Sequence, residues 1–427
     1  MRFILDFFYL LAIILASPVI AYRVIRHGRY RGQLAGRLGK APLRKPDDNL
    51  VIWIHAVSLG EINAARSIIA EIKNQMPAAR IIVSTSTDTG LNQAKKLYSA
   101  EHDVFSWPLD FSLVVSRALK RAKPDLVVLM EGEAWPNFLA SCNSRDIPAV
   151  IVNGRMSPNK GYPRYKKLGP IATGLFNRLT RIGVQDQIYA DKFLALGVKP
   201  EKVVVTGMLK YDTIQVADQI EGAAELAKTF SISEDDNLIV AGGTGPGEEE
   251  IILDAFEQIR QFHSKARLAI VPRKPERFDD VAKLIQSRDK CIRRSQTPDN
   301  SETQVDKSAI ILGDTMGELR KFYSLSSQIF VGRSLVKMGG SDMIEAAALG
   351  KPTCYGPHVF NFPQANDLLK NGCVEVKNAS DLAGIVCNWI EKPELAKQAG
   401  LTAKEFIKSQ QGASIRNVEM MKKLLGR

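Results

Sequence analysis

The sequence lacks several patterns that would assign it quickly to a class. Its five cysteines, in 427 residues, are scattered without a CxxC pair, so they offer neither a zinc cage nor a disulfide framework and fit a reducing cytosol. There is no GxxxxGK[ST] loop for a nucleoside triphosphate. The nearest approach to GxGxxG, residues 243–248, lacks the last glycine and contains Pro246, which argues against a hydride-transferring dehydrogenase.

The sequence also has no charge-free run as long as an ordinary membrane span, which needs about 20 residues. The run from Phe7 to Tyr22 has 16 residues, contains Pro18 and is followed, not preceded, by basic residues, unlike a signal peptide. We therefore expect residues 1–22 to form an uncleaved anchor or an in-plane interfacial helix. The basic residues after it would keep the chain on the cytoplasmic side of the inner membrane. A helix buried in the protein is the alternative.

The net charge of +12 is concentrated in two segments without acids. Residues 23–45 hold eight Lys or Arg and residues 154–185 hold seven, so the remainder is slightly acidic. Such segments favour phosphate-bearing partners. Aromatic residues are not interleaved with them as in single-strand binders, apart from Tyr162 and Tyr165. A membrane surface is therefore the expected partner, and nucleic acid is not.

From residue 50 onward, short apolar strands alternate with amphipathic helical segments, which predicts doubly wound parallel sheets. This alternation of strands and helices stops in an acidic, Ala-rich stretch and then resumes. The second half of the chain therefore repeats the architecture of the first. We expect an α/β protein of two Rossmann-like domains facing across a cleft. The predicted parts are an anchor (1–22), a basic juxtamembrane segment (23–49), an N-terminal domain (50–214), a linker (215–236), a C-terminal domain (237–405) and a C-terminal helix (406–427).

The stretch LVIWIHAVSLGE, residues 50–61, organises the first domain. It reads as a strand buried on both faces, then a turn, then a helix with apolar residues at helical spacing. Glu61 is thereby placed near a helix N-terminus at the carboxyl end of a parallel strand, where open α/β sheets bind ligands. Helix capping is the alternative role for this carboxylate.

Two more polar clusters follow strands of the first half. Glu131 and Glu133 come directly after the apolar run 126–130, and buried carboxylates are costly unless they face a cleft or pair with cations. Lys210 follows the run 203–206. We expect Glu131 to belong to a site, whereas Glu133 is expected to cap the helix that begins at Trp135. Lys210 has the alternative of pairing only with Glu131 or Asp212.

The second half presents glycine turns and cations at successive strand ends. The turn 242–245 precedes a helix whose free amides can accept a phosphate, and Arg273 can hold a phosphate bidentately. The segment 316–319 starts a helix after the strand 310–312. The turn 339–345 combines glycines, free amides and a carboxylate spaced for a ribose diol.

Six motifs taken together, HAVSLGE, EGEAWPN, GMLKYD, PRKPERF, DTMGEL and GGSDMIEAAALGKP, resemble the 3-deoxy-D-manno-octulosonic acid (Kdo) transferases, glycosyltransferase family 30. The resemblance covers nearly the whole chain and implies a GT-B fold. It also implies transfer of Kdo from CMP-Kdo to the lipid A precursor, lipid IVA, with inversion at the anomeric carbon, as a step of lipopolysaccharide assembly.

By motif, Glu61 corresponds to the family's general base, and Glu131 and Lys210 correspond to its pair that stabilises the transition state. The family's CMP-binding segments fall on Pro272, Arg273, Gly317, Glu318, Leu319, Asp342, Met343, Ile344 and Glu345. The donor's leaving group carries one phosphate, so no cofactor and no bridging metal ion is expected.

The chain departs from the family pattern at two places around the nucleotide. The family usually has His where this chain has Lys274, and His-Asn where it has Ser341 and Asp342. An ionised Asp342 accepts hydrogen bonds but cannot donate them. Two other functions stay open from the residues alone: a GT-B enzyme acting on a UDP-sugar, and a membrane-anchored nucleotide-binding protein without turnover.

Overall fold

The computed structural model describes residues 2–27, 33–157, 161–214, 216, 220–233, 235–297, 299 and 305–426. It divides into two compact units, of which the first contains residues 1–213 and 410–427 and the second residues 214–409. Three cations of the two basic segments, Arg29, Arg31 and Lys160, lie outside the described part.

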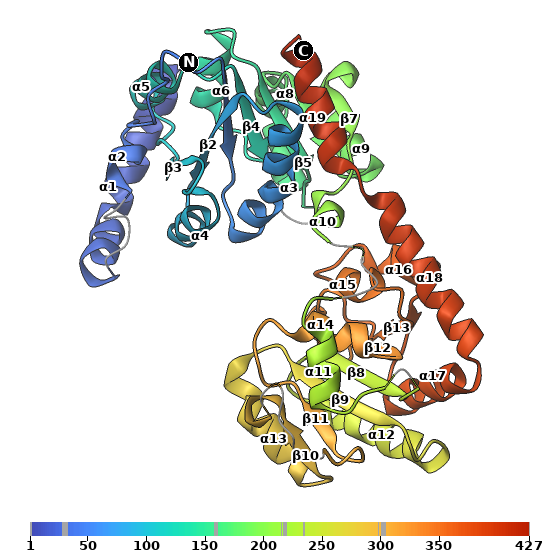
Figure 1. Ribbon diagram of the computed structural model, residues 1–427. Coiled ribbons are helices and arrows are strands. Elements are labelled where there is room, and N and C mark those ends of the chain that lie inside the picture. The colour runs from blue at the N-terminus through green and yellow to red at the C-terminus, as the bar shows by residue number, and fades with distance from the viewer. Residues whose placement is uncertain are drawn as a thin grey trace. The chain divides into compact units, whose positions relative to one another are not determined.

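Unit 1, drawn in Figure 1, contains one parallel sheet. The sheet has seven strands in the order β3-β2-β1-β4-β5-β6-β7. The order reverses between β1 and β4, which are hydrogen-bonded neighbours. The elements are α1 (Arg2–His27), α2 (Leu34–Arg37), β1 (Leu50–His55), α3 (Leu59–Gln75), β2 (Ala79–Thr85), α4 (Asp88–Tyr98), β3 (Asp103–Ser106), α5 (Ser112–Ala122), β4 (Leu126–Met130), α6 (Pro136–Asn143), β5 (Ala149–Gly154), α7 (Gly161–Leu168), α8 (Pro170–Phe176), β6 (Arg181–Val184), α9 (Gln187–Ala195), β7 (Val203–Val205), α10 (Leu209–Asp212) and α19 (Ala413–Leu424).

Both faces of this sheet are covered by helices, so its central strands β1 and β4 are apolar at nearly every position. In β1, Val51 and Trp53 pack with α5, α6, α8 and α9, whereas Ile52 and Ile54 pack with α3, α4, α10 and α19. Successive side chains of a strand point to opposite faces, which explains the division. All six residues of β1 are buried. The continuous apolar run predicted this two-sided burial correctly.

Unit 2 repeats the plan with a second parallel sheet, in the order β10-β11-β9-β8-β12-β13-β14. Here the order reverses between β8 and β12, which pair in parallel. The elements are α11 (Ala223–Thr229), β8 (Leu238–Thr244), α12 (Glu249–Phe262), β9 (Arg267–Pro272), α13 (Phe278–Gln286), β10 (Cys291–Arg293), β11 (Ile310–Leu312), α14 (Leu319–Leu325), β12 (Gln328–Val331), α15 (Met343–Ala347), β13 (Thr353–Tyr355), α16 (Ala365–Lys370), β14 (Val374–Glu375), α17 (Ala379–Glu391) and α18 (Pro393–Gln410).

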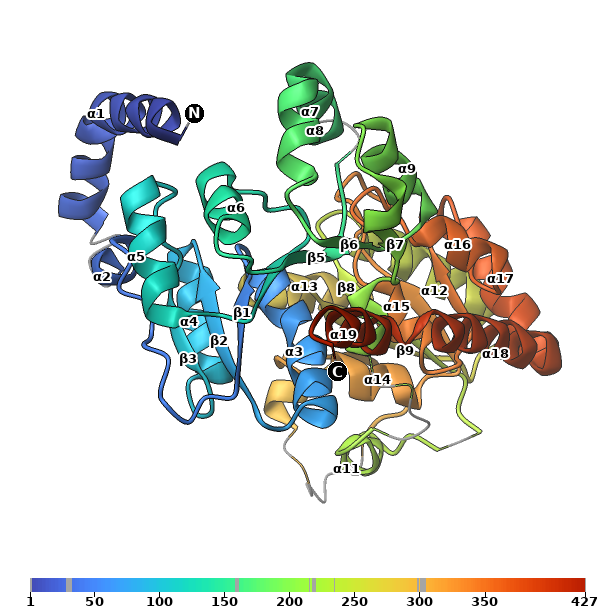
Figure 2. The ribbon, with the colours of Figure 1, turned by 90° about the horizontal axis from the view of Figure 1, so that it is seen from above.

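The predicted α/β class with two Rossmann-like sheets is confirmed. The sequence did not indicate β10 and β14, the two edge strands of the second sheet, which have three and two residues. The last helix, α19, belongs to the core of unit 1 through Val418 and Met421. The rest of this unit is formed by residues far earlier in the sequence. Figure 2 shows α19 beside α3.

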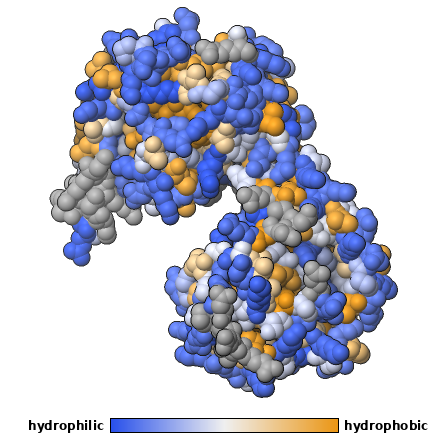
Figure 3. Space-filling view, in the orientation of Figure 1, coloured by the Kyte–Doolittle hydropathy of each residue, from blue (hydrophilic) through white to orange (hydrophobic). Residues whose placement is uncertain are grey.

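Helix α1 contains the apolar run near the N-terminus and leaves many of its large side chains exposed. Phe7 is 64% exposed and Leu15 is 73% exposed, so this helix is not buried in the protein. Where the structure describes the chain, it contains no helix that combines the length and the hydrophobicity needed to cross a bilayer. By contrast, the face of the molecule seen in Figure 3 is largely hydrophilic over both units.

Candidate active site

Glu61 lies in the first turn of α3, directly after β1, at the point where the strand order of the first sheet reverses. Ser58 is the N-cap, and its side chain accepts the Glu61 N–H at 3.2 Å. The Glu61 carboxylate reaches back, and its Oε2 accepts the Val57 N–H at 2.9 Å. The capping role is therefore real, and it occupies one carboxylate oxygen. The side chain is 7% exposed, so it is a positioned carboxylate at a strand end.

Glu131 follows β4, the neighbour of β1, and has a left-handed backbone with φ of 60°. A non-glycine residue in this region is strained, and such strain concentrates at functional sites. Its Oε2 accepts Arg155 Nε at 2.6 Å, and the two backbones are joined as well. Burial raises the pKa of Glu131, Arg155 opposes that rise, and the charge of Glu61 adds to it.

Glu133 belongs to the same cluster. Burial raises the pKa of Glu133, and so do the charges of Glu61 and Glu131, whereas Arg164 lowers it. Three carboxylates follow β1 and β4, which pair side by side, so they lie within electrostatic reach of one another. We infer a common site at the reversal point of this sheet, where ligands bind in such folds.

The expected capping of α6 by Glu133 is wrong. This helix begins at Pro136, and no side chain of its N-cap residue, Trp135, closes it. Instead Asp110 accepts the N–H groups of Asn137 and Phe138 at 3.0 and 2.8 Å. Asp110 lies in the loop after β3. Nothing in the sequence pattern around it indicated that it would cap α6. Its role depends on the pairing of strands.

Lys210 lies in the short helix α10, which packs against α3 and α19. The start of α10 is fixed at the end of β5, because Leu209 N–H donates to Asn153 Oδ1 at 3.1 Å. The two carboxylates considered as its partners have other contacts: Glu131 pairs with Arg155, and Asp212 accepts the backbone N–H groups of Gly412 and Ser414. The helix that carries Lys210 thus lies against α3, which has Glu61 in its first turn.

In unit 2, Arg273 and the turn before α15 both lie against the end of β8, because Arg273 N–H donates to the Thr244 carbonyl oxygen at 3.1 Å and Ser341 Oγ donates to the Gly243 carbonyl oxygen at 2.7 Å. Tyr323 is fully buried, and its hydroxyl has no hydrogen-bond partner among the residues that the structure describes. Burial and the charges of Glu345, Asp342 and Glu248 raise the pKa of Tyr323 well above its ordinary value, whereas Arg273 lowers it. The charges of Glu248, Arg273 and the α15 carboxylates are therefore neighbours, at the carboxyl ends of β8, β9 and β12.

The glycine turn before α15 has the geometry that its sequence requires. Gly339 and Gly340 have φ of 89° and 85°, values that side chains strongly disfavour. Asp342 caps α15, and its Oδ1 accepts the Ile344 N–H at 3.2 Å. Met343 and Ile344 are completely buried, so their side chains are not available to a ligand. Within this motif, the partly exposed polar residues are Asp342 and Glu345.

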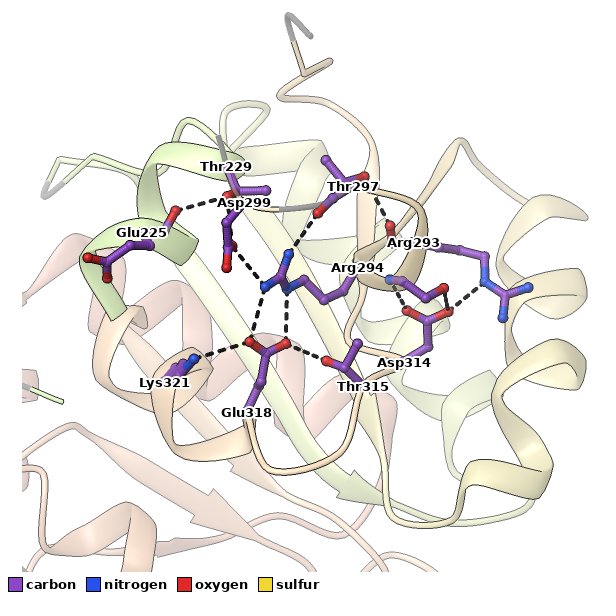
Figure 4. A network of polar contacts seen from close by, with 11 residues as sticks. Glu225, Thr229, Arg293, Arg294, Thr297, Asp299, Asp314, Thr315, Glu318 and Lys321 are labelled. Atoms are coloured by element: carbon purple, nitrogen blue, oxygen red, sulfur yellow. Dashed lines mark hydrogen bonds and ion pairs between the residues drawn. The ribbon is translucent and has the colours of Figure 1, made fainter. Parts of the chain in front are cut away.

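The segment 317–319 starts α14, but the carboxylate of Glu318 is engaged within the protein. Arg294 donates to both of its oxygens, Nε at 2.9 Å, and Lys321 and Thr315 also contact it (Figure 4). These hydrogen bonds outweigh the effect of burial and lower the pKa of Glu318 to about 2. A ligand at this turn would therefore meet Gly317 and the backbone, and not the Glu318 carboxylate.

The PRKPERF segment is fixed by a buried ion pair. Pro272 ends β9 and is buried, and Arg273, the next residue, is exposed. Arg277 donates through both terminal nitrogens to Glu249, a wholly buried residue at the start of α12, and Thr244 donates to the same carboxylate. The pair holds the loop of Arg273 against the end of β8. Across the described ranges, no group of three His, Cys, Asp or Glu side chains is arranged to hold a metal ion.

Comparison with known proteins assigns the chain to a family. A family model for 3-deoxy-D-manno-octulosonic-acid transferase (kdotransferase) matches residues 32–213. The chain is 32% identical over 432 aligned residues to the 3-deoxy-D-manno-octulosonic acid transferase of Haemophilus influenzae, and the match covers 99% of both proteins. The chain belongs to the Kdo transferase family. A transferase of the same name from Chlamydia muridarum is 27% identical over 95% of this chain and 93% of its own length.

Solved structures show the fold class of this Kdo transferase family member. The UDP-GlcNAc 2-epimerase of Neisseria meningitidis, bound to UDP-GlcNAc, matches with a TM-score of 0.57 and covers 88% of this chain and 100% of its own. At 15% identity this likeness concerns the fold alone. It agrees with the GT-B class implied by the motifs, which combines two Rossmann-like units.

Proposed function

We propose that this protein transfers Kdo from CMP-Kdo to the lipid A precursor, lipid IVA, with inversion at the anomeric carbon. The observation that carries the proposal is the carboxylate cluster of Glu61, Glu131 and Glu133 at the reversal point of the first sheet, in a chain that belongs to the Kdo transferase family. A sugar hydroxyl is a weak nucleophile, and a positioned carboxylate is the group that takes its proton.

In the proposed reaction, the acceptor hydroxyl attacks the anomeric carbon of Kdo while Glu61 takes its proton. The new carbon–oxygen bond forms as the bond from that carbon to the CMP phosphate oxygen breaks, and CMP departs with the electron pair. One displacement inverts the configuration. Glu131 and Lys210 are proposed to stabilise the transition state, with Glu131 held by Arg155 at 2.6 Å.

For the donor, we propose that CMP lies at the carboxyl ends of β8, β9 and β12. Arg273 is exposed and suited to a phosphate, and Glu345 at the start of α15 is suited to a ribose diol. Pro272 and the segments 317–319 and 342–344 would contribute mainly backbone, since the Glu318 carboxylate, Met343 and Ile344 are occupied or buried.

We also propose that the protein is attached to the cytoplasmic face of the inner membrane. The support is the row of exposed apolar side chains on α1 and the basic residues of α7, Arg164, Lys166 and Lys167, all exposed. Cations of this kind suit the phosphates of a bisphosphorylated lipid acceptor or of anionic lipids. Reversing these three charges is expected to weaken lipid binding.

The test is incubation of the purified protein with CMP-Kdo and lipid IVA, followed by mass spectrometry of the lipid. Glu61→Gln keeps an oxygen for the Val57 N–H but cannot accept a proton, so we expect kcat to fall by about 10²–10⁴ with an unchanged melting temperature. Glu71→Gln, the same change later in α3, is the control. A fully active Glu61→Gln, or transfer from a UDP-sugar in place of CMP-Kdo, contradicts the proposal.

A further inference from the structure

Arg333 lies at the reversal point of the second sheet, two residues after β12, and its backbone is left-handed with φ of 59°. A side chain in this region costs free energy that glycine would avoid. The chain nevertheless has arginine here. Strain of this kind persists where the surrounding structure enforces it, and it is concentrated at ligand sites.

The enforcement comes from Glu248, a carboxylate with no exposed surface. Its Oε1 accepts the N–H groups of Ser334 and Leu335, each at 2.9 Å. Its Oε2 accepts Gly245 N–H at 3.3 Å and also the Arg333 N–H. One buried carboxylate therefore ties the loop after β12 to the loop after β8.

The side chain of Arg333 is poorly satisfied by the protein. Its Nη2 donates to the carbonyl oxygen of Met338 at 3.3 Å, and its Nε is buried with no hydrogen-bond partner within the described ranges. In the part of the chain that the structure describes, Arg333 forms no ion pair with a carboxylate. A partly buried guanidinium without an anion is unfavourable, so this arrangement is suited to receiving one.

The aliphatic part of the Arg333 side chain lies against the glycine turns that are predicted to approach the nucleotide. A Cβ added to Gly245 would lie 3.0 Å from Arg333 Cγ. The Arg333 carbonyl oxygen accepts Gly340 N–H at 2.8 Å. Ser341 Oγ donates to the Gly243 carbonyl oxygen at 2.7 Å, and this bond joins the turn after β8 to the turn before α15. Arg333 is thus placed where β8 and β12 end side by side, the position at which open sheets bind ligands.

We propose that Arg333 binds an oxyanion of the nucleotide-sugar donor, either the phosphate or the carboxylate of the sugar acid. This inference rests on the proposed donor, CMP-Kdo. Arg333 would provide a second cation in addition to Arg273. Arg273 follows β9, whereas Arg333 follows β12. The competing explanation is that Arg333 has a purely structural role. In that case its replacement should lower the melting temperature and leave donor binding unchanged.

The experiment compares Arg333→Gly and Arg333→Met with Lys337→Gln, a control that removes an exposed cation from the same loop. Calorimetric titrations with CMP and with cytidine are combined with KM for CMP-Kdo and with the melting temperature. For both Arg333 variants we expect donor binding to weaken at least about tenfold. Lys337→Gln should change it less than about twofold. Arg333→Gly should melt at the same or a higher temperature, because glycine relieves the strained backbone.

The titrations also distinguish the two anions. Weaker CMP binding with unchanged cytidine binding identifies the phosphate, whereas unchanged CMP binding with a raised KM for CMP-Kdo identifies the sugar carboxylate. Variants that bind CMP and CMP-Kdo as the wild type does overturn the role of Arg333 alone. Wild-type protein that binds neither overturns the proposed donor as well. If Arg333→Gly fails to fold, Arg333→Met, which keeps the stem over Gly245, decides the question.

Discussion

At the scale of single residues, Asp110 shows how one buried carboxylate joins three parts of unit 1. Its two oxygens accept backbone N–H groups at the start of α6, and Tyr9 of α1 donates to it at 3.3 Å. Asp6 of α1 accepts from Asn137 Nδ2 at 2.9 Å. The N-terminal helix is therefore hydrogen-bonded to the EGEAWPN motif, which also carries Glu131.

Asp110 should make the stability of unit 1 depend on pH. Burial is the main cause that raises the pKa of Asp110 to about 6 from 3.8, and the folded state therefore binds a proton more tightly than the unfolded state. The stability that proton binding by Asp110 contributes is present below pH 4 and is lost as the pH rises through 6. The free energy of unfolding should fall by about 3 kcal/mol over this range.

Denaturant titrations at pH 4 and pH 6.5 measure this effect, with Asp110→Asn as the reference. The variant has no proton to bind, so the difference between wild type and variant isolates this group from the other carboxylates. A difference that stayed constant with pH would show that Asp110 is not the residue responsible.

Glu61 shows, at the same scale, that a capping role is compatible with the catalytic role proposed for it. One carboxylate oxygen accepts the Val57 N–H, and the cap fixes the direction of the side chain at the end of β1. A capped and rigid carboxylate is what a general base requires, because its geometry is set before the substrate binds.

At the scale of elements, the loop of Arg273 depends on the ion pair between Arg277 and Glu249. Arg277→Met should leave a wholly buried carboxylate without its cation and destabilise unit 2 by about 3–5 kcal/mol. CMP affinity should fall in the same variant, because the loop after β9 loses its attachment to α12. Urea unfolding and CMP titration measure the two effects.

The matched control is Arg288→Met, which breaks an ion pair with Asp254 whose side chains are 31% and 50% exposed. Water screens such a pair, so the loss should be less than about 1 kcal/mol. Equal losses for the two variants would contradict the importance of the buried pair.

At the scale of the whole molecule, membrane attachment should depend on α1. Replacing Phe8, Leu11 and Leu15 by Ser removes exposed apolar surface and should weaken binding to anionic phospholipid vesicles about tenfold or more. Cosedimentation with the vesicles measures the loss. The control replaces Phe262, Leu395 and Leu401, which are exposed apolar residues of unit 2. Equal binding by the two variants would exclude α1 as the attachment.

Kdo transfer should also proceed without a divalent metal ion. The expected leaving group carries a single phosphate, and cationic side chains and backbone N–H groups can stabilise its charge. Dialysis against EDTA should therefore change kcat by less than about twofold. Loss of activity that Mg²⁺ restores would refute this expectation.

Much of the architecture follows from the sequence by itself, because buried parallel strands are local apolar runs and helices repeat at their own period. The strands at 50–55, 126–130 and 310–312 and the helix at 249–262 are all visible in this way. The motifs at strand ends likewise predict that Glu61 and Glu131 belong to one site, and the structure places them after the paired strands β1 and β4.

Only the tertiary structure decided which groups meet. It gave the cap of α6 to Asp110 and not to Glu133, joined Glu131 to Arg155, and engaged the Glu318 carboxylate with Arg294. It also revealed Arg333 beside the glycine turns. These pairings arise from the order of strands in a sheet, which brings distant segments together, and a periodicity that extends over a few residues contains no information about that order.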